Sequence, residues 1–133
     1  MTTSSLRRTF ATACFAVVAL SLLAACSSDD PKPPKSDLTL TVTPAAQGST
    51  PTRVTLTCEP TGGNHTNAEA ACAALAAAGG DFDKLVGDPT AVCTQVYEPV
   101  TAAVTGTWQG KKVDWQKTFG NKCELSGRTT PVF

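Results

Sequence analysis

The chain has 133 residues, with 11 basic and 11 acidic side chains, one histidine and six cysteines. This length supplies one small domain and leaves no room for a second. A formal net charge of zero without basic blocks excludes a nucleic-acid-binding protein, because such proteins need surplus Lys and Arg to displace counterions from phosphate. Six cysteines in so short a chain make the cellular compartment the next question.

The first 25 residues have the pattern of an export signal. Arg7 and Arg8 precede an apolar run over residues 10–23, which is shorter than the roughly 20 residues that a membrane-spanning helix needs. The run ends in Leu-Ala-Ala-Cys, which resembles a bacterial lipobox. We therefore expect cleavage before Cys26 and lipidation of its thiol; the alternative is an ordinary signal peptide with a cysteine near its cleavage site.

This processing defines what remains of the chain. Removal of residues 1–25 leaves 108 residues with 9 basic and 11 acidic side chains, a formal charge of −2. Residues 26–37 then form the lipidated Cys26 and a Pro-rich tether, whose composition favours an extended backbone. Two acyl chains hold a protein stably on a membrane, whereas one gives only marginal affinity. We expect an exported protein anchored to the outer face of the bacterial cell membrane, or released outside the cell.

The folded domain is expected over residues 38–133. Apolar and β-branched polar residues alternate at 38–43 and again at 54–57, a pattern typical of strands that are buried on one face. The Ala-rich segment at 67–78 predicts a helix, and the pair of glycines after it gives a stop signal.

The second half of the domain predicts a hairpin. Residues 100–108 and 113–119 have the pattern of two strands, and Gly110 between them supplies the positive φ angle of a tight turn. Residues 81–85 favour a short turn of helix, and a last short strand is expected over residues 128–133. The sum is an α+β fold, a two-layer sandwich in which one or two helices cover one face of an antiparallel sheet of about five strands.

Four cysteines fall within this domain, since Cys14 is lost with the signal and Cys26 is expected to carry lipid. The four are Cys58, Cys72, Cys93 and Cys123. An even number in a small exported domain predicts two disulfide bonds. Three connectivities exist, of which chain economy favours Cys58 with Cys72 and Cys93 with Cys123. A loop closed in this way contributes roughly 3 kcal/mol in the chain-entropy model.

The domain lacks the residue sets that catalysis and metal binding need. No Cys-x-x-Cys or His-x3-His pair occurs, and two disulfides leave no free thiol, so we expect neither a zinc site nor a cysteine nucleophile. The single histidine, His65, lies in a Gly-rich segment and is expected to be a solvated loop residue. No Gly-rich phosphate loop is present, and no cofactor is expected. The chain is therefore not expected to be an enzyme.

Residues 92–99, with the sequence VCTQVYEP, are the most informative segment. They follow a group of turn formers and contain a disulfide cysteine, and the β-branched Thr94 and Val96 favour an extended backbone. An extended loop held by a disulfide is what a rigid protease inhibitor presents, because preorganisation removes the entropy loss of ordering on binding. A stiff connection between helix and sheet explains the same residues equally well.

Five blocks of sequence resemble the Streptomyces subtilisin inhibitor family and together cover nearly all of the domain. The blocks are VTLTC at 54–58, ACAALAAAGGD at 71–81, CTQVYEPV at 93–100, GTWQGK at 106–111 and FGNKCE at 119–124. The resemblance implies the disulfide pairing that chain economy favours, a five-stranded antiparallel sheet with two helices, and a homodimer formed through the sheet. It also implies inhibition of serine proteases.

By this resemblance the reactive bond joins Gln95 to Val96. The binding loop around the bond comprises Val92, Cys93, Thr94 and Tyr97. The resemblance also implies that Asn121 hydrogen-bonds the loop from behind and that Gln95 enters the primary specificity pocket of a subtilisin-like serine protease. The alternative function is an envelope lipoprotein that binds a partner through the same fold without inhibiting a protease.

This sequence departs from the family pattern at the reactive bond. Gln95 stands where family members often carry Met, Lys, Arg or Leu. Burial of an apolar side chain contributes about 1.5–3 kcal/mol, so Gln is expected to bind roughly 10- to 100-fold less tightly than Met in an apolar pocket. Gln also offers no cation to an acidic pocket floor, which argues against trypsin-like targets.

Overall fold

The structure, a computed structural model, describes residues 32–133. The expected signal peptide, Cys26 and the first part of the tether lie outside these residues. Within the described range, no helix combines the length and the apolar character needed to cross a membrane.

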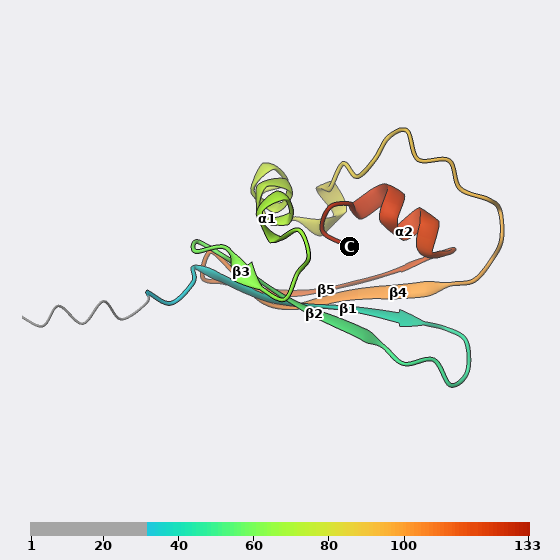
Figure 1. The fold of residues 1–133 in the computed structure, drawn as a ribbon, viewed down its shortest axis with the longest axis horizontal. Helices are drawn as coiled ribbons and strands as arrows, with labels where there is room; N and C mark the ends of the chain where they lie inside the picture. Colours follow the sequence, from blue (N-terminus) through green and yellow to red (C-terminus); the bar gives the residue numbers. More distant parts are fainter. Residues whose placement is uncertain (1–31) are drawn as a thin grey trace, which may run out of the picture. The chain divides into compact units, whose positions relative to one another are not determined.

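The domain consists of an antiparallel sheet of five strands with the helices on one face (Figure 1). In chain order the elements are β1 (Ser36–Pro44), β2 (Thr52–Cys58), β3 (Gly62–Gly63), α1 (Ala68–Ala77), the 3-10 turn η1 (Phe82–Lys84), β4 (Val100–Trp108), β5 (Lys111–Phe119) and α2 (Lys122–Thr129). The strand order is β3-β2-β1-β4-β5. This architecture confirms the expected α+β fold.

The alternation of side chains along β1 explains why one face of the sheet is covered. Leu38 and Leu40 are buried under the helices, with 0% and 2% of their surface exposed, while Thr39 lies on the opposite, open face. The register places Leu38 beside Leu56 of β2 and Leu40 beside Val104 of β4. These contacts form an apolar layer against which α1 packs.

The helix α1 packs its short side chains on this layer. Ala71 and Leu75 are fully buried, and Cys72 forms a disulfide with Cys58 at the end of β2. This is one of the two bonds that chain economy favours. It fixes the helix to the sheet at a point where small alanine side chains contribute little contact area.

The hairpin between β4 and β5 is tighter than expected. Gln109 and Gly110 both have positive φ angles, 47° and 79°, as a two-residue turn of type I′ requires. The strand β5 therefore begins at Lys111, two residues before the expected start.

The prediction of a last strand over residues 128–133 is wrong. The helix α2 occupies Lys122–Thr129, and the fifth strand is instead the two-residue β3, paired with β2. The helix escapes a composition-based prediction because Ser126 and Gly127 have low helix propensity. Its stability comes from its cap and from buried contacts of Leu125 and Thr129.

His65 has a structural role in place of the expected solvated one. The ring is half-buried, its Nδ1 accepts a hydrogen bond from the Asn67 backbone N–H (3.0 Å), and its Nε2 lies 3.0 Å from the Val132 carbonyl oxygen. Because Nδ1 accepts, Nε2 carries the proton and donates. His65 thus ties the start of α1 to the carboxyl-terminal segment.

Candidate functional site: the 85–99 loop

A long loop, residues 85–99, connects η1 to β4 and curves past the end of α2 (Figure 1). Its apolar side chains point into solvent: Val92 is 94% exposed, Tyr97 79% and Val96 56%. Gln95 and Thr94 are exposed as well. Because these apolar side chains are not buried, they do not fix the path of the loop. Hydrogen bonds and a disulfide must fix it instead.

The first attachment fastens the start of the loop to the end of α2. The Asp88 backbone N–H donates to the Gly127 carbonyl oxygen at 2.8 Å. Gly87 approaches so closely, with a φ angle of 64°, that a Cβ atom there would collide with the same carbonyl oxygen. Only glycine fits at residue 87, and Gly127 in turn leaves room for Ala91.

Asp88 also shapes this part of the loop internally. Its carboxylate accepts hydrogen bonds from the Thr90 hydroxyl (2.6 Å) and the Thr90 backbone N–H (2.9 Å). Both hydrogen bonds lower the pKa of Asp88 below its ordinary value, and the bond from the Thr90 hydroxyl has the larger effect. The arrangement is an Asx turn, which fixes the backbone just before the extended segment.

The second attachment is the disulfide between Cys93 and Cys123. Cys93 lies two residues before Gln95, and Cys123 lies in the first turn of α2. The bond matches the pairing favoured by chain economy. It fixes the loop covalently on the amino-terminal side of Gln95.

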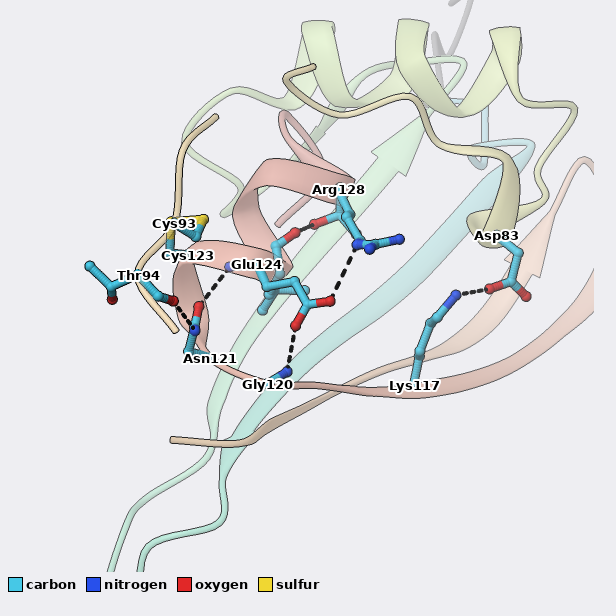
Figure 2. A network of polar contacts seen from close by, with 11 residues as sticks. Asp83, Cys93, Thr94, Lys117, Gly120, Asn121, Cys123, Glu124 and Arg128 are labelled. Atoms are coloured by element: carbon cyan, nitrogen blue, oxygen red, sulfur yellow. Dashed lines mark hydrogen bonds and ion pairs between the residues drawn. A yellow bond between two sulfur atoms is a disulfide. The ribbon is translucent and has the colours of Figure 1, made fainter. Parts of the chain in front are cut away.

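The third attachment is the side-chain amide of Asn121, the N-cap residue of α2. Its Nδ2 donates to two loop carbonyl oxygens, that of Thr94 at 3.2 Å and that of Val96 at 2.8 Å. Its Oδ1 accepts the Glu124 backbone N–H at 2.8 Å and so caps the helix. Figure 2 shows the amide placed between the loop and the helix. One side chain therefore holds the carbonyl groups on both sides of Gln95.

The fourth attachment returns the chain to the sheet. The Glu98 backbone N–H donates to the Gly120 carbonyl oxygen at 2.9 Å, and Pro99 accepts from the Ala45 backbone N–H, also at 2.9 Å. Gly120 directly precedes Asn121, so all of these attachments except the Pro99–Ala45 bond lie on α2 or on the two residues before it.

Of the residues predicted from the sequence, the loop brings Val92, Cys93, Thr94, Gln95, Val96 and Tyr97 together in one exposed segment, with Asn121 and Cys123 behind it. Sequence reasoning missed the backbone attachments at Asp88 and Glu98, which have no side-chain signature. It also missed Glu124, although Asn-x-x-Glu at residues 121–124 is a capping pattern. Among the described residues, no cluster of three or more His, Cys, Asp or Glu is arranged to hold a metal ion.

Comparison with known proteins decides the family. The family model described as "Subtilisin inhibitor-like" matches residues 34–121. The chain belongs to the subtilisin inhibitor-like family. The match spans the sheet, α1 and the whole 85–99 loop, and it ends at Asn121.

Individual relatives agree with this assignment. The chain is 45% identical over 98 residues to "Subtilisin inhibitor-like protein 5" of Streptomyces fradiae, covering 72% of this chain and 92% of the relative. It is 44% identical over 102 residues to "Subtilisin inhibitor" of Streptomyces albogriseolus, covering 74% of this chain and 71% of the relative.

A solved structure extends the similarity to three dimensions. It is the crystal structure of Streptomyces caespitosus sermetstatin in complex with Bacillus licheniformis subtilisin, with 34% identity and a TM-score of 0.62. The superposition covers 74% of this chain and 96% of that one. The domain of this chain therefore has the fold of an inhibitor whose structure was solved in complex with a subtilisin.

Proposed function

We propose that this protein inhibits subtilisin-like serine endopeptidases by occupying their active site as a substrate does, with Gln95–Val96 as the reactive bond. The observation that carries the proposal is the Asn121 amide, which binds the carbonyl groups on both sides of that bond, at Thr94 and Val96. Membership of the subtilisin inhibitor-like family supports the class of target. The protein acts as a binding partner of an enzyme and is not an enzyme itself.

The mechanism follows from what remains attached if the bond is cut. The exposed, extended segment pairs with the substrate cleft as an added strand, and the protease serine attacks the Gln95 carbonyl carbon. The new end at Gln95 stays held by the Cys93–Cys123 disulfide, and the new amine at Val96 stays held through the Val96 carbonyl and Glu98. Because the amine remains beside the acyl-enzyme, it reforms the peptide bond in competition with hydrolysis.

Specificity rests on the exposed side chain of Gln95, which projects from a fixed backbone. An uncharged polar side chain enters an apolar or mixed pocket less favourably than Met, and it offers no charge to an acidic pocket. We therefore expect moderate affinity for subtilisins and poor affinity for trypsin-like enzymes.

A titration tests this function. Subtilisin activity is measured against rising amounts of the protein lacking residues 1–26, with both disulfides verified by mass spectrometry. Stoichiometric loss of activity at micromolar or lower concentration supports the proposal. Full residual activity with intact disulfides would contradict it and favour the non-inhibitory binding module.

We further propose that the protein is exported and anchored to the outer face of the bacterial cell membrane through a lipid on Cys26. The support is the lipobox pattern and the polar, Pro-rich segment that follows it. Metabolic labelling with a fatty-acid analogue should mark the wild-type chain and leave Cys26→Ser unlabelled. Cys14→Ser, within the apolar run, is the matched control and should remain labelled; loss of label from both, or from neither, contradicts the proposal.

We also propose a homodimer formed through the open face of the sheet. This face carries Thr39 and Thr41 of β1 next to Thr105 and Ala103 of β4, so small side chains leave it flat enough for a second copy. Sedimentation at micromolar concentration should show a dimer, and Ala103→Lys at the centre of the face should give a monomer. A wild-type monomer at these concentrations would contradict the proposal.

A further inference from the structure

The Glu124 side chain links the residue before the N-cap of α2, Gly120, to the last turn of α2 at Arg128. The 85–99 loop is attached at both places. Glu124 belongs to the first turn of α2, and its side chain is 38% exposed. One carboxylate oxygen, Oε2, accepts the Gly120 backbone N–H at 2.8 Å, and the other, Oε1, lies 3.3 Å from Arg128 Nε. Figure 2 shows the carboxylate between Gly120 and Arg128, to the right of Asn121.

This contact differs from an ordinary capping box by one residue. In that motif the acidic side chain reaches back to the backbone N–H of the N-cap residue itself, which here is Asn121. Glu124 instead binds the N–H of Gly120, the residue before the cap. The shift places the carboxylate on the residue whose carbonyl oxygen accepts the Glu98 N–H.

Gly120 needs such a restraint because glycine has the widest backbone freedom of any residue. Its N–H is held by Glu124 and its carbonyl oxygen by Glu98, and the next residue supplies the amide that binds Thr94 and Val96. A rotation at Gly120 would displace the Glu98 contact and the Asn121 side chain together. A charge-assisted hydrogen bond is strong enough to oppose that rotation.

Glu124 also fixes which way the Asn121 amide faces. Its backbone N–H donates to Asn121 Oδ1, so the Nδ2 group is left to point at the two loop carbonyls. A rotated amide would set its oxygen against the oxygens of Thr94 and Val96. The carboxylate of Glu124 therefore holds Gly120, and its backbone N–H orients the Asn121 amide. Both groups support the proposed reactive bond.

We infer that Glu124 is a positioning residue of the inhibitor: its carboxylate locks Gly120 and thereby holds the two sides of the Gln95–Val96 bond in register for religation. The inference rests on the proposed inhibitory function and names a residue on which that function depends. Glu124 does not touch the protease; it acts through Gly120 and Asn121.

The test compares Glu124→Ala with Glu124→Gln in the purified protein. A Gln side chain keeps an oxygen that accepts the Gly120 N–H, whereas Ala removes it. We expect subtilisin to cut the 95–96 bond of Glu124→Ala at least about 10-fold faster, the size of effect that one charge-assisted hydrogen bond gives. Glu124→Gln keeps the hydrogen bond without the charge and should restore part of the resistance. Mass spectrometry of the stoichiometric mixture over time measures the cut.

Two controls separate positioning from general destabilisation. Glu69→Ala removes the acidic side chain from the first turn of the other helix, α1, and should leave the cleavage rate unchanged. Leu75→Ala destabilises the core and should also leave it unchanged well below the unfolding temperature. Cleavage of Glu124→Ala at the wild-type rate, acceleration in Leu75→Ala to the same extent, or failure of Gln to rescue would each overturn the inference.

Hydrogen exchange of the free protein distinguishes failure of this inference from failure of the proposed function. We expect the Glu98 amide to exchange about 10-fold faster in Glu124→Ala, while the Asp88 amide, held by Gly127, keeps its wild-type rate. If the wild-type protein does not inhibit subtilisin, the proposed function fails and exchange still tests the positioning. Unchanged exchange at Glu98 overturns the inference even if inhibition is observed.

Discussion

Asn121 serves two structures with one side chain, and this is why its substitution must be chosen with care. The oxygen caps α2 through Glu124 N–H, and the nitrogen holds the carbonyls of Thr94 and Val96. Replacement by alanine would remove both roles at once, and loss of an N-cap alone destabilises by about 0.5–2 kcal/mol. Only a residue that caps without donating to the loop isolates the second role.

Asn121→Ser is that substitution. Serine is about as good an N-cap as asparagine, so the contribution of the helix cap to the free energy of unfolding should be kept, and Asn121→Ser should unfold less readily than Asn121→Ala. Two hydrogen bonds to the loop are lost at about 1 kcal/mol each, which predicts about 30-fold weaker inhibition or faster cleavage. Denaturant unfolding and an inhibition assay measure the two quantities. Equal inhibition by Asn121→Ser and the wild type would show that the amide does not support the loop.

At residue 95 this chain departs from the family pattern in a way that is expected to weaken binding to subtilisin. Gln95→Met replaces a polar amide with an apolar side chain of similar length, and burial in an apolar pocket should tighten binding to subtilisin about 10- to 100-fold. Gln109→Met, in the exposed turn between β4 and β5, is the matched control and should leave the inhibition constant unchanged. If Gln95→Met binds no more tightly than the wild type, Gln95 does not enter the specificity pocket.

At the scale of the elements, the structure assigns to α2 the task of holding the 85–99 loop. The helix has only eight residues, yet Gly127, Cys123 and its N-cap Asn121 each attach a different part of the loop. Its own position is fixed by Leu125, buried in an apolar cluster with Val100 and Phe119. The position of most of the loop therefore depends on the contact between α2 and the β4–β5 hairpin.

The sequence predicted some of these elements and not others for physical reasons. Strands with one buried face follow from alternation, and α1 follows from its alanines, because in both cases the signal is local. The helix α2 depends on a cap and on buried contacts of Leu125, which outweigh the poor propensity of Ser126 and Gly127. The disulfide pattern and the family blocks pointed to the loop, but the roles of Asp88, Glu98 and Glu124 depend on contacts that only the folded chain brings together.

A second link between elements joins η1 to β5 and depends on pH. Asp83 accepts hydrogen bonds from Lys117 Nζ (2.8 Å) and Trp115 Nε1 (3.2 Å). The bond from Lys117, followed by that from Trp115, lowers the pKa of Asp83 below its ordinary value of 3.8. A lowered pKa in the folded state means that this stabilisation is present above the ordinary value and is lost as the pH falls through the folded value.

The prediction is a pH-dependent difference between the wild type and Asp83→Asn. The wild type should unfold at higher temperature than the variant at neutral pH, and the difference should shrink as the pH falls from about 5 to about 2. Lys117→Gln removes the larger cause and should flatten the profile in the same way. Thermal unfolding followed by circular dichroism measures this, and parallel profiles for all three proteins would refute the link.

At the scale of the whole domain, the described chain begins at one end of the sheet and the 85–99 loop ends at the other. The strand β1 runs from Ser36 to Pro44, about 30 Å at 3.3 Å per residue. Pro44 pairs with Val100, where the loop enters β4. The described chain therefore enters the domain at the end opposite to the 85–99 loop, as Figure 1 shows for the start of β1 and for the loop.

This polarity predicts that the site of attachment to a membrane decides whether the protein still inhibits. The described chain enters the domain through β1, at the end opposite to the loop, so with a lipid on residue 26 we expect vesicle-bound protein to inhibit subtilisin as strongly as free protein. A lipid placed at the opposite end, by coupling a maleimide lipid to Ser49→Cys in a Cys26→Ser background, should bring the loop against the bilayer. Ser49 lies in the turn between β1 and β2, beside the segment where Ala45 binds Pro99, so steric exclusion of the protease should weaken inhibition at least about 10-fold. Inhibition assays with vesicles of uncharged lipid compare the two forms, the unlipidated Ser49→Cys protein serving as control for the substitution. Equal inhibition by the two anchored forms would mean that the polarity of the domain does not govern access of a protease to the loop.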